Sequence, residues 1–219
     1  FCKHGFFFDR AQRRSPEACQ GARRRRVKRA RQETYHYKGV DFLVNADDKY
    51  KVIPLLVERL ADEFLAATKL HSKVLAVRFD LHPHDKQISN KPVEDLMRWF
   101  KNSLKRNYRM NNIGHYWVRE LCKKGKDTHW HVVLWLDGNK VQSSWSVTDK
   151  IKRYWEGSKL LGSVSIPQNC YTQINCDDKE AFDEAFYRSS YLAKERSKQF
   201  TQQTRGFSCS NLAKKAKWL

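Results

Sequence analysis

The sequence predicts an α+β fold, in which helices pack on the faces of an antiparallel sheet, from three observations. Val52 to Leu70 and Pro92 to Asn107 repeat apolar residues at helical spacing. Lys73 to Leu81 is a nearly continuous apolar run of strand length, which is typical of a central strand. The strand-like runs His115 to Leu121 and Thr128 to Asp137 are separated by a short polar loop, and strands joined in this way pair antiparallel.

The other elements are predicted from weaker patterns. Tyr35 to Val44 alternates loosely, as an edge strand does, and Pro167 should interrupt a strand over Ser163 to Asn175. Val147 to Glu156 predicts a short helix. Asp177 to Gln199 predicts the last long helix, with Asp177 or Asp178 as its N-cap.

Composition indicates one folded domain with an anionic partner. The 219 residues are 40% hydrophobic and 13% aromatic, enough for one substantial core. Forty-three Lys and Arg residues against 24 Asp and Glu residues give a formal charge of +19, which favours nucleic acid over a membrane because no long apolar run is present. Six cysteines without a CxxC pair indicate neither a zinc ribbon nor a disulfide framework, so a cytoplasmic location is expected.

Basic residues divide the chain into three parts. Residues 1–32 carry eleven Lys and Arg residues against two acidic ones, which predicts either a solvated tail or a flexible arm that follows phosphates. Residues 33–200 form the expected domain, and residues 201–219 a basic C-terminal tail. The residues predicted to contact DNA are Arg23, Arg24, Arg25, Arg26, Arg78, Lys124, Lys126 and Arg205.

A candidate metal site lies on the second strand of the predicted hairpin. Side chains alternate along a strand, so His129 and His131 share one face while Trp130 lies on the other. Two neutral imidazoles at this spacing can bind a divalent ion, although such pairs are also found on ordinary half-exposed surfaces. Glu120, near the end of the preceding strand, would add a carboxylate and complete the site. His82 and His84, which follow the central strand around Pro83, could line its mouth, although such residues are more often ordinary loop histidines.

A candidate nucleophile lies on the last predicted helix. Tyr187, Tyr191 and Lys194 would share one helix face. Ordinary packing explains such tyrosines when they are considered alone. Beside a metal ion, however, a tyrosine could attack a phosphodiester while the ammonium stabilises the developing negative charge. The products would be a tyrosyl phosphate ester and a free 3′ hydroxyl.

These motifs resemble those of a known superfamily. His129–Trp130–His131 is similar to the histidine–hydrophobic–histidine signature of HUH endonucleases, and Tyr191–Leu192–Ala193–Lys194 is similar to their YxxK motif. A strand over Val74 to Leu81 precedes both, which is also the order in that superfamily. Over residues 35–210 the chain most resembles rolling-circle replication initiators, namely inovirus-type replication proteins and relatives of the YagK/YfjJ type.

The resemblance implies a five-stranded antiparallel sheet with helices on it and a Mg or Mn ion bound by His129, His131 and an acidic or polar third ligand. It also implies nicking of single-stranded DNA at a replication origin by Tyr191, with Lys194 as the motif lysine. Tyr187 resembles the second tyrosine of some phage initiators, or it is structural. The sequence has no GxxxxGK[ST] loop, so a helicase of the bacterial host would be the unwinding partner.

Three alternatives remain open at this stage. Relaxases and single-strand transposases of the same superfamily share the chemistry. A metal-dependent hydrolase would use the histidines to activate water and would not need the tyrosines. A non-catalytic module with a sheet like that of RNA-recognition domains would stack bases on its aromatic residues, namely Trp117, Trp130, Trp135 and Tyr116.

Overall fold

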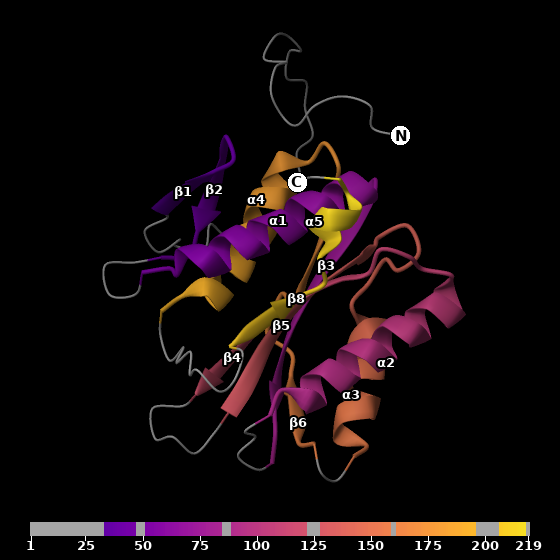
Figure 1. Ribbon diagram of the computed structural model, residues 1–219. Helices are drawn as coiled ribbons and strands as arrows, with labels where there is room; N and C mark the ends of the chain where they lie inside the picture. The colour runs from indigo at the N-terminus through magenta and orange to yellow at the C-terminus, as the bar shows by residue number, and fades with distance from the viewer. Residues whose placement is uncertain are drawn as a thin grey trace, which may run out of the picture.

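The computed structural model describes residues 33–46, 51–84, 89–121, 128–158, 161–195 and 206–217. Figure 1 shows a central sheet with helices on two sides. In chain order the elements are β1 (Glu33–Tyr37), β2 (Val40–Val44), α1 (Pro54–Leu70), β3 (Lys73–His82), α2 (Lys91–Tyr108), β4 (Gly114–Leu121), β5 (Thr128–Asp137), α3 (Trp145–Glu156), β6 (Ser163–Ser165), β7 (Tyr171–Asn175), α4 (Lys179–Ser190), the 3₁₀ helix η1 (Tyr191–Ala193), β8 (Phe207–Cys209) and α5 (Leu212–Lys215).

The central sheet has the strand order β6, β3, β5, β4, β8, and β7 pairs with the other part of β3. All of these pairings are antiparallel. The predicted α+β fold is therefore confirmed, with six strands in the sheet where five were expected. The stretch predicted as one edge strand is instead a separate hairpin of β1 and β2.

A hydrophobic core lies on each face of the sheet because its strand residues alternate in direction. Helices α1, α4 and α5 cover one face and α2 and α3 the other (Figure 1). Along β5, Val133 and Trp135 join the first core, whereas Trp130, Val132 and Leu134 join the second. The prediction that Trp130 lies opposite the two histidines is confirmed.

The aromatic residues offered as a base-stacking surface are buried within these cores. Trp117, Trp130, Trp135 and Tyr116 are each at most 1% exposed. Their rings pack against other apolar side chains and the Tyr116 hydroxyl donates to the carbonyl of Leu56 at 3.2 Å. The proposed stacking role of these four residues is therefore wrong, because a base cannot reach them.

Two expectations for connecting segments have different outcomes. The stretch from 163 to 175 is divided into β6 and β7 around Pro167, as predicted. Residues 206–217, expected in the C-terminal tail, instead contribute β8 to the sheet edge beside β4 and α5 against α1. Local sequence patterns could not predict this strand, because β8 is only three residues long. Within the described ranges, no helix is both long enough and apolar enough to cross a membrane.

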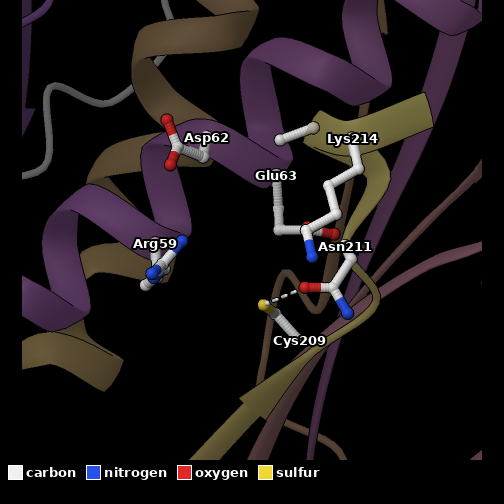
Figure 2. A pocket seen from close by; sticks show the side chains of 7 residues that line it. Arg59, Asp62, Glu63, Cys209, Asn211 and Lys214 are labelled. Carbon is white, nitrogen blue, oxygen red and sulfur yellow. Dashed lines mark hydrogen bonds between the residues drawn. The ribbon is translucent and has the colours of Figure 1, made fainter. Parts of the chain in front are cut away.

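Glu63 of α1 holds this C-terminal segment in place. Its carboxylate accepts hydrogen bonds from the backbone N–H of Leu212 at 2.8 Å and from the Ser210 hydroxyl. Figure 2 shows the small pocket beside it, lined by Arg59, Asp62, Glu63, Cys209, Asn211, Ala213 and Lys214. Since two cations and two carboxylates share this wall, the pocket has no single charge preference.

Candidate metal centre

The strand register brings three metal-ligating residues together on the α1–α4 face of the sheet. Glu120 of β4 pairs with His129 of β5, and His131 is two residues further along the same face. Oxygen and nitrogen ligand atoms of the three side chains all lie within 4.8 Å of one another. Glu120, His129 and His131 could therefore hold a metal ion, in the combination that the sequence predicted.

The distances within this cluster fit a divalent ion. Glu120 Oε2 lies 3.3 Å from Nε2 of His129 and 3.2 Å from Nε2 of His131. Ligands bonded at about 2.1 Å to one ion are separated by about 3.0 to 3.4 Å when they occupy adjacent positions. Nε2 of His131 is buried and, apart from its contact with Glu120 Oε2, has no polar partner in the part of the chain described. A bound cation would satisfy that nitrogen.

Asp80 orients one of the ligands from behind. Nδ1 of His131 lies 2.6 Å from Asp80 Oδ1, on the neighbouring strand position of β3. A proton on Nδ1 donated to this carboxylate leaves the lone pair of Nε2 directed at the cluster, an arrangement common at metal sites. Asp80 thus fixes both the tautomer and the direction of the ring.

The pKa values of Asp80 and His131 are shifted in directions that strengthen the hydrogen bond between them. Burial by itself raises the pKa of Asp80, but the hydrogen bond from His131 and the charges of His131 and Arg78 outweigh burial and lower it. Burial likewise lowers the pKa of His131, but its hydrogen bond to Asp80 and the carboxylate of Glu120 outweigh burial and raise it. The two carboxylates therefore give the site a strong preference for positive charge.

Sequence reasoning missed Asp80, although a signal was present. Arg78, Asp80 and His82 occupy every second position of an otherwise apolar strand, which places three polar side chains on one face. The ring of His82 stacks on that of His129, with centroids 5.3 Å apart. His82 is the last residue of β3 and lies against a candidate ligand, so the interpretation of it as an ordinary loop histidine is wrong.

Tyr191 borders this candidate metal site. Its ring meets that of His131 edge to face, with centroids 5.7 Å apart and an interplanar angle of 87°. The guanidinium carbon of Arg78 lies 4.8 Å from the centre of the tyrosine ring, and Nζ of Lys194 lies 5.8 Å from it. A half-buried phenol is thus placed between two cations and a histidine that could ligate a metal ion.

The predicted helix does not extend through Tyr191 and Lys194. α4 ends at Ser190, Tyr191 begins η1, and Lys194 is extended and bridges to Val52. The cause is long-range pairing: the backbone N–H of Ile53 donates to Ala193 O at 2.8 Å, which draws the chain out of the helix. The single helix face expected for Tyr187, Tyr191 and Lys194 is therefore wrong, although Lys194 still approaches Tyr191.

The remaining predicted residues are divided between the site and the undescribed segments. Tyr187 lies one turn earlier on α4, where its backbone carbonyl accepts a hydrogen bond from the Ser190 hydroxyl. Arg78 lies in the site. Arg23, Arg24, Arg25, Arg26, Lys124, Lys126 and Arg205 lie outside the described residues.

The family of the chain can be stated from comparison with known domains. A family model described as the YagK/YfjJ C-terminal domain matches residues 35–210. The chain belongs to the YagK/YfjJ C-terminal domain family. In this YagK/YfjJ domain the matched range spans the whole sheet, the three ligands and Tyr191. No match was found among curated proteins or among solved structures.

Proposed function

We propose that this YagK/YfjJ domain is an HUH-type replication initiator, related to the inovirus-type replication proteins, that nicks and rejoins single-stranded DNA at an origin. One observation carries the proposal: Tyr191 packs against His131, which is itself one of three residues that could hold a metal ion. A reactive phenol beside a site of this kind suits phosphodiester chemistry better than a purely structural role.

The reaction is a transesterification. The Tyr191 hydroxyl oxygen attacks the phosphorus, the bond between phosphorus and the 3′ oxygen breaks, and the leaving oxygen takes up a proton as a 3′ hydroxyl. The phenol proton passes to solvent. Attack by a 3′ hydroxyl on the 5′-phosphotyrosine reverses these bond changes and rejoins the strand without a nucleotide cofactor.

The surrounding side chains support this chemistry in different ways. Glu120, His129 and His131 would hold Mg or Mn, and such an ion polarises the phosphodiester when bound. Lys194 and Arg78 place positive charge beside the phenol, where it favours binding of a phosphate and offsets charge that develops during the attack. Asp80 keeps His131 in the ligating orientation.

The partners follow from this chemistry. The substrate is single-stranded DNA, and a helicase of a bacterial host would provide it by unwinding the duplex. Relaxase and transposase roles use the same bond changes and would be distinguished by the DNA that the protein selects. Burial of the four central aromatic residues removes the main support for a non-catalytic stacking module.

The experiment uses a single-stranded DNA library with a randomised centre, because the residues do not specify the origin sequence. In Mn²⁺ the wild-type chain should form a covalent protein–DNA adduct that survives denaturing electrophoresis, and EDTA should abolish it. Tyr191→Phe should lower the yield at least about 1000-fold, whereas the matched variant Tyr187→Phe should retain it. Cleavage that persists in Tyr191→Phe without an adduct would support a metal-dependent hydrolase instead.

A further inference from the structure

Two aromatic side chains are exposed at the edge of the sheet where β7 pairs with β3. Trp145, the first residue of α3, is 73% exposed, and Tyr171, the first residue of β7, is 44% exposed. Their neighbours touch, since the Cys170 thiol donates to the Ser144 hydroxyl at 3.4 Å. Two segments remote in sequence thus bring these exposed rings to one region of the surface.

The register shows on which face Tyr171 lies. It pairs with Val77 of β3, whose side chain belongs to the core beneath α2 and α3. Paired residues of an antiparallel sheet project to the same face, so Tyr171 lies on the side of α3 and therefore of Trp145. The two rings are on the opposite face from Tyr191.

Arg78 connects the segment that carries Tyr171 to the candidate metal centre, and Arg188 also contacts that segment. The backbone N–H of Arg78 donates to Cys170 O at 2.7 Å, and its guanidinium lies over the ring of Tyr191. Arg188 donates from Nη1 to Asn169 O at 3.2 Å. The segment 169–171 therefore runs from Arg78, whose guanidinium lies beside the phenol on one face, to the exposed aromatic residues on the other.

We propose that Trp145 and Tyr171 form a stacking platform for the single strand that leaves the site, a role that rests on the proposed function. Cations near the phenol suit the backbone phosphates, and flat aromatic side chains suit the unpaired bases that follow. The net charge of +19 favours this polyanion over an apolar protein partner. Duplex DNA gains less binding free energy from these aromatic side chains, because its bases are already stacked on one another.

Binding of fluorescently labelled DNA to the full chain, measured by anisotropy in EDTA, tests the platform without any chemistry. Trp145→Ala and Tyr171→Ala should each weaken single-strand binding about tenfold, within the range for loss of one stacked base. Binding of the matched duplex should change less than about twofold. Leu55→Ala is the control, because Leu55 is also exposed, at 49%, but is the second residue of α1.

The outcomes separate this inference from the proposed function. Unchanged single-strand binding in both variants would overturn the platform, and so would an equal loss for single strand and duplex. A wild-type chain that forms no adduct in Mn²⁺ would contradict the proposed function, even where Trp145→Ala weakens binding selectively. Circular dichroism of each variant confirms that a change in binding does not arise from unfolding.

Discussion

At the scale of single residues, Asp80 fixes the orientation of the His131 ring. The contact of 2.6 Å to Nδ1 directs Nε2 toward Glu120 and His129. We expect Asp80→Asn to weaken Mn²⁺ binding about 10- to 100-fold, as loss of an outer-shell carboxylate commonly does. Isothermal titration calorimetry at constant pH measures the affinity.

A second His–Asp pair provides the control for this variant. Nδ1 of His36 lies 2.8 Å from Asp41 Oδ1, but both side chains are 70% exposed and remote from the cluster in the strand order. Asp41→Asn should leave Mn²⁺ affinity unchanged. Equal affinities for wild type and Asp80→Asn would show that Asp80 does not orient a ligand.

A second single residue, His115 on β4, makes the free energy of unfolding depend on pH. Burial, followed by the charge of Lys101, lowers its pKa from 6.5 to about 3. Between these two values the unfolded chain binds a proton that the folded chain excludes, so the free energy of unfolding falls as pH drops below 6.5. The contribution of this one residue is at most about 1.4 kcal/mol per pH unit.

The test compares slopes rather than absolute stabilities. Urea unfolding of wild type and His115→Leu at pH 7.5, 6.0 and 5.0 should show a smaller loss of stability with acid in the variant. The substitution removes the titrating ring and keeps an apolar side chain in a buried position. Identical slopes would mean that His115 does not contribute to acid sensitivity.

At the scale of elements, the junction of α4 with η1 positions Tyr191. The Ser190 hydroxyl accepts from the backbone N–H of Asn45 at 2.7 Å and donates to Tyr187 O at 2.8 Å. We expect Ser190→Ala to destabilise the chain by about 1 to 3 kcal/mol, because the Asn45 donor loses its partner. Urea denaturation measures the change.

The preceding serine is a matched control. Ser189 is also buried, but its hydroxyl donates to Ala185 O within the same helix. Ser189→Ala should therefore cost less than Ser190→Ala, and adduct yield should fall only in the latter. Equal costs would contradict a special role for the junction.

The same junction shows what sequence patterns can and cannot predict. The hairpin of β4 and β5, the central strand β3 and the facing of His129, His131 and Glu120 followed from local periodicity and loop length. The end of α4 could not be predicted from local patterns, because it depends on pairing between Ile53 and Ala193, which are 140 residues apart in the sequence. Asp80 was missed for a related reason, since its role exists only once β3 pairs with β5.

At the scale of the whole molecule, the candidate metal site lies at one end of the sheet, in a chain whose formal net charge is +19. The segment of residues 1–32 holds eleven Lys and Arg residues and is expected to follow phosphates rather than to read bases. Deletion of this segment should weaken single-strand binding and reduce its dependence on salt. The amount of adduct formed at saturating DNA concentration should remain unchanged.

Anisotropy between 50 and 300 mM KCl measures this dependence. Each phosphate contact that is lost should reduce the slope of log affinity against log salt by about 0.7. An unchanged slope would identify residues 1–32 as a solvated tail that makes no phosphate contacts.

The central claim is that Tyr191, beside a site formed by Glu120, His129 and His131, becomes bonded to DNA. Mass spectrometry of the nuclease- and protease-digested adduct tests it most directly. The account predicts a nucleotide-modified peptide with the phosphate on residue 191. Modification of another residue, or cleavage that leaves a free 5′ phosphate and no modified peptide, would contradict it.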